Sequence, residues 1–398
     1  MSKSSFSPWP MVTKEEINAV VDVLSSNKVN YWTGNECRQF EREFAQFVGC
    51  RYAIAVSNGT TALDLALLAL DVGEGDEVIV TSRTFLASAS TIVNARATPV
   101  FADVSSDTQN IDAGSIEKVI TDQTKAIVCV HLAGWPCDMG PIMALAEKYK
   151  LLVVEDCAQA HGARYKGRSV GAIGHIGAWS FCQDKIMTTG GEGGMVTTND
   201  KALWSRMWSH KDHGKSWNAV YERDHPQGFR WVHESFGTNW RMTEMQAAIG
   251  RVQLKQLSDW NAKRLANANM IWRAARDLKG LRVPELTCFG CQGDCNYTNG
   301  CVHAAYKCYF FVDGSEFDRD KILSGIKEKG VPCFPGSCSE VYLEKAFEGT
   351  SFRPKKRLPN AKKLGETSLM FLCHPTLTEN EVKLMCDVLI EVVSDHFG

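Results

Sequence analysis

The chain has 398 residues, more than one hydrophobic core usually supports, so we expect two domains. Hydrophobic residues make up 44% and charged residues 23%, as in ordinary globular proteins, and a net charge of -2 argues against a general nucleic-acid binder. No apolar run is long enough to span a membrane, and the start, MSKSSFSPWPMV, lacks the apolar core of a signal peptide. We therefore expect a cytoplasmic protein whose cysteines are free thiols.

The first half of the chain alternates between short β-branched segments and helical patterns. The expected strands are YAIAVS (52–57), DEVIVTS (76–82), TPVFADV (98–104), KAIVCVHL (125–132), LLVVED (151–156), GAWSF (177–181) and GGMVTT (193–198). Between several of them lie helical patterns such as TTALDLALLAL (60–70) and GPIMALAEKYK (140–150). This alternation predicts an α/β fold with a mostly parallel sheet and helices on its faces.

The second half is expected to hold a functional loop, a bridging helix and a smaller domain. The polar and aromatic stretch 210–240 has no period and is too long for a passive connection, so it predicts an extended functional loop. A helical period over 243–278 predicts a helix that bridges into a small α+β domain. We divide the chain into a large domain, 1–255, and a bridging helix with the small domain, 256–398.

Ligands of open parallel sheets bind beyond the carboxyl ends of the strands, so the residues there are candidates for function. Gly59 and Thr60 open a helix directly after a strand, where backbone N–H groups attract an anion; alternatively, this is an ordinary capped helix start. The strand LLVV ends in Glu155 and Asp156. After four apolar residues we expect Asp156 to be half buried, although an acidic pair at a strand end can also simply be solvated. Phe85, after another strand, offers an aromatic wall.

The strand GAWSF delivers Ser180 and then Lys185, at the mouth of a glycine-rich turn. Lys185 is either a solvated surface side chain or an amine held there for chemistry. An anion cradle, an aromatic plate, a partly buried aspartate and a lysine after a strand together match what pyridoxal phosphate requires. We therefore predict pyridoxal phosphate as the cofactor and Lys185 as the catalytic residue.

Longer stretches of the chain resemble a known family. They are YWTGNECRQFEREFAQFVG, AVSNGTTALDLAL, TFLASASTIVNARATPVFADV, VHLAGWPCDM, VVEDCAQAHGARYKGRSVGAIGHIGAWSF, GGEGGMVTTND, TNWRMTEMQAAIGRVQL and LMFLCHPTLTENEV. In order and spacing they resemble the DegT/DnrJ/EryC1/StrS family of sugar aminotransferases. The resemblance covers about the first 255 residues and part of the C-terminal region. It implies the fold-type I architecture of pyridoxal-phosphate enzymes.

The resemblance also implies roles for single residues. Lys185 corresponds to the lysine that forms the Schiff base with the cofactor. Asp156 corresponds to the aspartate on the pyridine nitrogen, Gln159 to the glutamine near the ring hydroxyl, and Phe85 to the aromatic residue stacked on the ring.

The remaining implied roles concern the cofactor phosphate and the substrate. Gly59, Thr60 and Ser180 correspond to the phosphate-binding turn and serine. Asn239 corresponds to an asparagine that reaches the phosphate in the neighbouring subunit, which implies a homodimer with shared active sites. His161 and Glu192 are candidate substrate contacts.

One turn departs from the family pattern. The usual sequence is TTGEGG, whereas this chain has TTGGEGG, one glycine longer between Lys185 and Glu192. The extra residue could widen the substrate entrance without touching the Schiff base. Lys185 itself argues against the dehydratase members, in which histidine replaces the lysine.

The resemblance implies transfer of an amino group from L-glutamate to a nucleotide-linked keto sugar, for surface polysaccharide or glycan synthesis. The local match of DKIMTTGG favours a UDP-linked 4-keto-6-deoxy sugar, with a 3-keto sugar as the competitor. A non-catalytic cofactor-binding regulator is an alternative, although such proteins usually carry a DNA-binding module and we expect no helix-turn-helix extension. No membrane or nucleic-acid partner is expected.

A metal-dependent sugar-modifying enzyme is a second alternative. It would be built on the cluster Cys288, Cys291, Cys295 and Cys301. Only the first two cysteines have the short spacing typical of metal ligands, so we favour a cysteine-rich surface loop and expect no metal.

Overall fold

The computed structural model of the chain describes residues 6–289, 299–314 and 318–395. The strands, in chain order, are β1 Tyr52–Val56, β2 Glu77–Thr81, β3 Thr98–Ala102, β4 Thr124–Val130, β5 Leu152–Asp156, β6 Arg164–Tyr165, β7 Arg168–Ser169, β8 Ile176–Ser180, β9 Gly194–Thr198, β10 Leu281–Arg282, β11 Cys308–Val312, β12 Cys333–Phe334 and β13 Ser368–Phe371. The α-helices are α1 Lys14–Ser25, α2 Glu36–Val48, α3 Gly59–Ala69, α4 Ala87–Asn94, α5 Ala113–Glu117, α6 Met139–Tyr149, α7 Lys201–His210, α8 Trp217–Tyr221, α9 Glu244–Arg276, α10 Arg319–Glu328, α11 Pro359–Thr367 and α12 Glu379–Asp395. Short 3₁₀ helices lie at Leu132–Gly134, Val341–Leu343 and Lys345–Phe347.

The large sheet has seven strands in the order β1-β9-β8-β5-β4-β2-β3. β9 is antiparallel to both of its neighbours, while β8, β5, β4, β2 and β3 run parallel to one another. The prediction of a mostly parallel sheet is therefore confirmed. The seven segments predicted as strands correspond to β1, β2, β3, β4, β5, β8 and β9.

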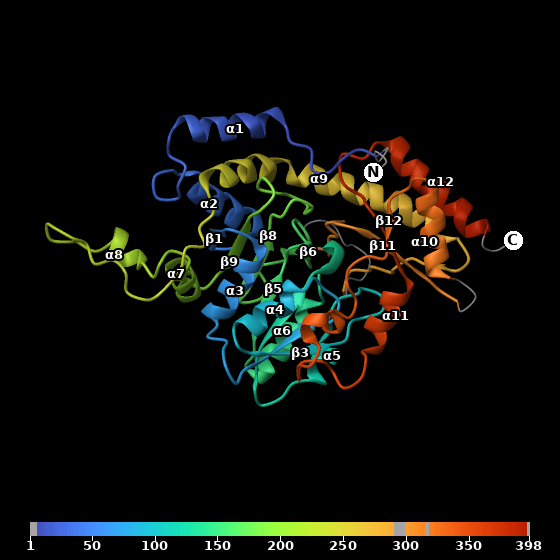
Figure 1. The fold of residues 1–398 in the computed structure, drawn as a ribbon, viewed down its shortest axis with the longest axis horizontal. Coiled ribbons are helices and arrows are strands. Elements are labelled where there is room, and N and C mark those ends of the chain that lie inside the picture. Colours follow the sequence, from blue (N-terminus) through green and yellow to red (C-terminus); the bar gives the residue numbers. More distant parts are fainter. Residues whose placement is uncertain (1–5, 290–298, 315–317, 396–398) are drawn as a thin grey trace.

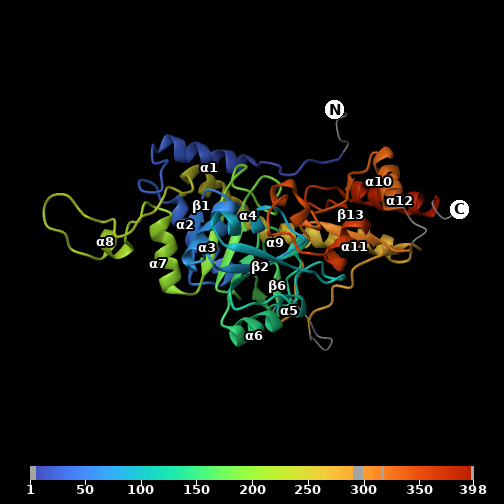
Figure 2. The ribbon, with the colours of Figure 1, turned by 60° about the horizontal axis from the view of Figure 1, so that its bottom comes forward.

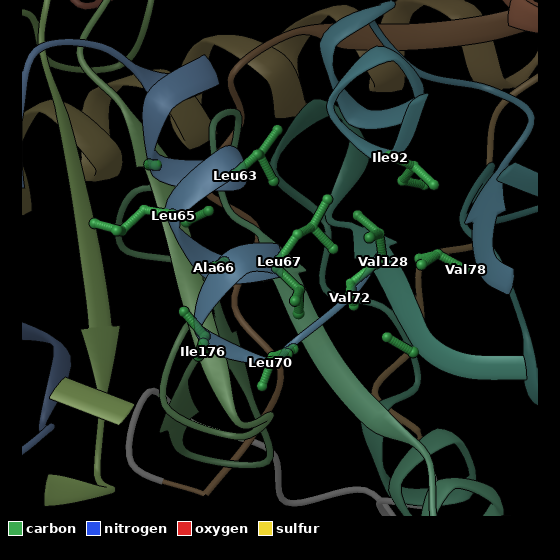
Figure 3. Packing of buried hydrophobic residues seen from close by; sticks show 14 of the residues in the cluster. Leu63, Leu65, Ala66, Leu67, Leu70, Val72, Val78, Ile92, Val128 and Ile176 are labelled. Atoms are coloured by element: carbon green, nitrogen blue, oxygen red, sulfur yellow. The ribbon is translucent and has the colours of Figure 1, made fainter. Parts of the chain in front are cut away.

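Helices cover both faces of the large sheet, and the side chains of each strand alternate between these two faces. Val78 and Val80 of β2 belong to one apolar cluster with Leu67 of α3 and Ile92 of α4. Figure 3 shows Val78 beside Val128 of β4. Ile79, between Val78 and Val80, points to the other face and packs with Ile142 of α6. Because the strands are buried on both faces, they read as continuous apolar runs in the sequence.

Helix α9 is the long helix that we predicted over 243–278, and it is confirmed. Thr243 caps its start in a capping box with Gln246, which fixes where the helix begins. It runs from the layer of α1 and α2 to α12 beside the second sheet (Figure 1). That sheet is antiparallel, in the order β10-β11-β13-β12, and packs with α10 and α12. Since α9 passes through residue 255, the division of the chain there stays a prediction.

The stretch 210–240, predicted as an extended loop, contains the short helix α8. Ser216 accepts a hydrogen bond from the Ala219 amide, and Trp217 contacts Tyr221 one turn later, with ring centroids 4.4 Å apart. These local contacts explain the helix, which a search for long periods could not detect. Figures 1 and 2 both show the α8 segment projecting away from the rest of the molecule. None of the helices in the described residues has the length and apolarity needed to cross a membrane.

Glu155 and Asp156 end β5 and point to opposite faces of the sheet. The Glu155 carboxylate is fully buried and accepts hydrogen bonds from the backbone amides of Gly171, Ile173 and Gly174, at 2.9, 2.8 and 2.6 Å. His131 Nε2 lies 3.0 Å from it. Burial raises the pKa of Glu155, but the hydrogen bond from His131 and the backbone hydrogen bonds bring that pKa below its ordinary value. Glu155 thus braces the segment that leads from β5 to β8.

We predict that Glu155→Gln destabilises the fold by about 3 kcal/mol, because an amide NH₂ would face backbone donors that now have an acceptor. Urea unfolding at neutral pH measures this loss. The stabilisation by the ionised carboxylate is present above the pKa of the unfolded chain and is lost as the pH falls through the folded-state pKa.

The matched control is Glu74→Gln, because Glu74 is an exposed glutamate whose partner Arg96 lies 3.8 Å away. This change should alter stability by less than about 0.5 kcal/mol. Equal effects of the two substitutions would contradict the bracing role of Glu155.

Candidate active site

Asp156 lies buried at the carboxyl end of β5, on the face of the sheet opposite Glu155. Its Oδ2 accepts a hydrogen bond from the Ser88 hydroxyl at 2.7 Å, and its Oδ1 accepts one from the Ala158 amide at 3.1 Å. Burial raises the pKa of Asp156, while these hydrogen bonds and the charge of Lys185 oppose that rise. A buried carboxylate without a close cation among the described residues is suited to bind a positively charged group.

Lys185 follows β8, the strand that pairs with β5, and is mostly buried. Its Nζ lies 3.4 Å from the Tyr306 hydroxyl and 3.4 Å from Asp184 Oδ1. The same tyrosine donates a hydrogen bond to the Asp184 carboxylate. The Lys185 backbone carbonyl accepts a hydrogen bond from the Trp9 indole at 2.9 Å. The amine is therefore held by its neighbour Asp184 and by the distant Tyr306, while the distant Trp9 holds the backbone of the same lysine.

Gly59 and Ser180 form a close contact between the start of α3 and the end of β8. A Cβ atom on Gly59 would lie 2.5 Å from Ser180 Cβ, so only glycine allows this approach. Asn58 caps α3 by accepting from the Thr61 amide at 2.9 Å, and Thr60 is exposed. The helix start and the serine hydroxyl therefore form a small cradle of the kind that binds phosphate.

Gln159 follows Asp156 by three residues and Phe85 precedes Ser88 by three, but Gln159 is buried whereas Phe85 is exposed. Gln159 is buried, and its Oε1 accepts a hydrogen bond from the Ala133 amide at 2.9 Å. Phe85 is 72% exposed, although its neighbours Thr84 and Ser88 are buried. A large exposed aromatic ring beside buried polar residues leaves a face on which a flat ligand can stack.

Three of the predicted residues lie outside this cluster. His161 is fully buried between Trp179 and Phe181, with ring centroids at 5.3 and 5.6 Å, and burial lowers its pKa to about 3. Glu192 is exposed on the turn after Lys185. Asn239 is exposed at the base of the α8 segment. The roles given to these three residues stay predictions.

The turn TTGGEGG needs glycine at two positions. Gly190 and Gly191 have φ angles of 78° and 109°, a region that other residues rarely adopt. The Gly191 amide donates to the Thr188 hydroxyl at 3.1 Å, and Thr189 Oγ1 donates to the Glu192 carbonyl at 2.6 Å. The extra glycine thus belongs to an ordered, hydrogen-bonded turn.

Several residues of the site were not predicted. Ser88 stands four residues after Thr84, and this helical spacing after a strand was an available signal. Tyr306 and Trp9 come from regions more than a hundred residues away from Lys185, and no local pattern in the sequence points to them.

Possible metal donors in the described residues are limited to one cluster, His131, Glu155 and Cys157. His131 Nδ1 accepts from the Cys137 amide at 3.0 Å, so its Nε2 carries the proton and donates to Glu155. Both ring nitrogens of His131 are thus engaged in hydrogen bonds within the protein. In the predicted cysteine cluster, the Cys301 amide donates to Cys288 Sγ at 3.0 Å, while Cys291 and Cys295 lie outside the described residues.

Comparison with known proteins agrees with this geometry. The sequence model of the DegT/DnrJ/EryC1/StrS aminotransferase family matches residues 10–390. The GDP-perosamine synthase of Escherichia coli O157:H7 is 35% identical over 97% of this chain and 98% of its own length. The dTDP-3-amino-3,4,6-trideoxy-alpha-D-glucose transaminase of Streptomyces venezuelae is 34% identical over 94% and 90%. The X-ray structure of the aminotransferase from Psychrobacter cryohalolentis has a TM-score of 0.95 and 62% identity, covering 99% of this chain and all of that one.

The mixed seven-stranded sheet, with a buried aspartate and a lysine on adjoining strands, defines a pyridoxal-phosphate-dependent enzyme of fold type I. More narrowly, the chain belongs to the DegT/DnrJ/EryC1/StrS aminotransferase family. It is a sugar aminotransferase, and its cofactor is pyridoxal phosphate, as predicted.

We predict that Asp156→Asn lowers turnover by orders of magnitude, because the neutral amide cannot hold a proton on the pyridine nitrogen. Cofactor binding should persist with reduced affinity, which a titration of the apoprotein followed by cofactor absorbance measures. Asp122→Asn is the matched control, since Asp122 is exposed and precedes β4, at the opposite end of the parallel strands from Asp156. Glu155 cannot take over the role, because its oxygens are bound to backbone amides and His131. A near-normal rate in Asp156→Asn would mean that the assignment is wrong.

Proposed function

We propose that this sugar aminotransferase moves an amino group from L-glutamate to a UDP-linked 4-keto-6-deoxy sugar. One observation supports the site above all others: the Asp156 carboxylate and the Lys185 amine lie at the ends of neighbouring strands, beside the Gly59–Ser180 contact. Asp156 would hold the pyridine nitrogen, Lys185 the aldehyde carbon, and the start of α3 the phosphate.

The remaining contacts of the cofactor follow from position. Phe85 would stack on the ring, and Gln159 would lie near its hydroxyl group. Ser88 keeps Asp156 oriented, because Thr84 donates to Ser88 and Ser88 in turn donates to the carboxylate. The Gly59–Ser180 cradle, which a Cβ would fill, fits a phosphate group. The residues present therefore suit pyridoxal phosphate.

When bound, the cofactor supplies an electron sink for the bonds around the donor's α-carbon. The chain supplies the proton transfer. Lys185 Nζ would act as the base that removes the proton from the donor's α-carbon, and as the acid that protonates the sugar carbon which receives the amino group. Asp184 Oδ1 and the Tyr306 hydroxyl, each 3.4 Å from Nζ, would orient the amine for these transfers. The Lys185 side chain is itself only 19% exposed, which limits access of water to the amine.

The identity of the sugar rests on weaker grounds than the chemistry. The segment DKIMTTGG resembles the branch that acts on UDP-linked 4-keto-6-deoxy sugars, which favours that substrate. A 3-keto sugar is the second candidate, because the Streptomyces venezuelae relative is named for a 3-amino sugar on dTDP. The product would enter a surface polysaccharide or another glycan.

We further propose a homodimer with shared active sites. The α8 segment carries Phe229 and Trp231, which are 75% and 79% exposed, on a part of the chain that projects from the body (Figure 2). Exposed aromatic side chains of this kind are typical of interface anchors. Asn239, at the base of the segment, would reach the cofactor phosphate of the partner.

Lys185→Ala should abolish turnover while leaving the fold intact, since the change removes both the bond to the cofactor and the proton carrier. The assay uses L-glutamate with UDP-, GDP- and dTDP-linked keto sugars of both keto positions, and circular dichroism checks the fold. Lys201→Ala, an exposed lysine at the start of α7, is the matched control and should keep wild-type turnover. Turnover by Lys185→Ala would contradict the mechanism. Turnover of only a 3-keto sugar by the wild type would contradict the proposed 4-keto substrate.

A mixture of Lys185→Ala and Asn239→Ala chains should recover activity above that of either parent. The mixed dimer has one site with both defects and one site with neither. Asn239→Ala must first be shown to be impaired by itself. If activity stays absent after subunit exchange has been verified, the sites are not shared in this way.

A further inference from the structure

The turn that follows β4 has a backbone conformation that is unfavourable for one of its residues. In the 3₁₀ helix Leu132–Gly134, Ala133 has a φ angle of 57° and a ψ angle of 5°, in the left-handed region. There the Cβ atom of an L-residue crowds the following carbonyl oxygen, which lowers the population of this conformation by about 10-fold for alanine. The turn therefore needs contacts with other parts of the chain that hold Ala133 in place.

Asn110, a buried residue between β3 and α5, spans this turn with its side-chain amide. Its Oδ1 accepts a hydrogen bond from the Leu132 amide at 2.9 Å, and its Nδ2 donates one to the Trp135 carbonyl, also at 2.9 Å. The two bonds fix the backbone on either side of Ala133 and Gly134. Because Asn110, Leu132 and Trp135 are all buried, water has little access to replace either bond if the side chain is removed.

Ala133 itself connects to two residues of the active site. Its amide donates to Gln159 Oε1 at 2.9 Å, and its carbonyl accepts from the Tyr306 amide at 3.0 Å. The Tyr306 hydroxyl lies 3.4 Å from Lys185 Nζ. One residue of the turn thus fixes both the side chain expected near the ring hydroxyl of the cofactor and the backbone of the tyrosine beside the catalytic lysine.

The turn is also in direct contact with the backbone that precedes β11. A Cβ atom on Gly134 would lie 3.0 Å from the Ala305 backbone nitrogen and 3.1 Å from that of Tyr306. The Ala304 amide donates to the Gly134 carbonyl at 2.9 Å. A change in the conformation of the turn would therefore displace Tyr306 as well.

We infer that Asn110 is a positioning residue of the active site: it holds the left-handed turn at Ala133 and, through that turn, Gln159 and Tyr306. This inference rests on the proposed function for the places of Gln159 and Tyr306 at the cofactor. Asn110 acts through the backbone, because its amide group is engaged by Leu132 and Trp135. Without these two bonds Ala133 would relax toward ordinary backbone angles, and its amide and carbonyl would turn away from their partners.

The first test is Asn110→Ala, which removes both bonds to the turn. It should lower the affinity of the apoprotein for pyridoxal phosphate by about 10-fold. A titration followed by cofactor absorbance measures the affinity, and visible circular dichroism reports the orientation of the bound cofactor. The matched control is Asn360→Ala, because Asn360, at the start of α11, donates instead to the Val104 carbonyl at 2.8 Å. The control should lose stability in urea but keep its cofactor affinity.

The second test is a rescue at Ala133. Glycine adopts left-handed angles as readily as right-handed ones, so the turn should persist without its clamp when residue 133 is glycine. Asn110→Ala combined with Ala133→Gly should therefore bind the cofactor within about threefold of the wild type. A general loss of stability would not be corrected in this way. If Asn110→Ala does not fold, Asn110→Asp, which keeps the acceptor for Leu132 and loses the donor to Trp135, replaces it in the same comparison.

Unchanged cofactor affinity in the Asn110 variant would overturn the inference, and so would an equal loss in Asn360→Ala or the absence of recovery with Ala133→Gly. The proposed function has its own test, which is conversion of the wild-type cofactor by L-glutamate alone. Failure of that conversion would leave the affinity measurements as they are, so the two results can be told apart.

Discussion

Two adjacent carboxylates at the end of β5 serve the two faces of one sheet. Glu155 points to the face where backbone amides and His131 surround it, and it fixes the path of the chain into β8. Asp156 points to the opposite face, where Ser88 holds it for a ligand. Because side chains alternate along a strand, a shift of one residue in β5 would exchange these two environments. The register of this strand therefore determines both the brace and the site.

The site owes its compactness to the order of the strands. β8 lies beside β5, so the residues that follow Ser180 reach the edge at which Asp156 lies. The start of α3 reaches the same edge because Gly59 permits contact with Ser180. Gly59, Asp156 and Ser180 are far apart in the sequence, and they meet because the elements that carry them end at the same edge of the sheet. The parallel strands therefore bring side chains from distant segments together at one edge of the sheet.

Much of this arrangement could be predicted from the sequence, because strands buried on both faces leave continuous apolar runs with polar residues at their ends. Lys185, Asp156 and Gly59 were selected by that rule. Tyr306 and Trp9 could not be found in the same way, since their contacts with Lys185 depend on how distant segments pack. Helix α8 was missed because it is a single turn stabilised by a cap and an aromatic contact.

The contacts of Trp9 also bear on the order in which the protein can form. The indole packs against Trp260, with ring centroids 5.2 Å apart, and against His374, which lies close to the end of the chain. During synthesis on the ribosome, the strands through Thr198 emerge well before either partner. The large sheet can therefore begin to assemble while the nascent chain is still growing. The surroundings of Lys185, in contrast, are complete only after the first and the last segments have met.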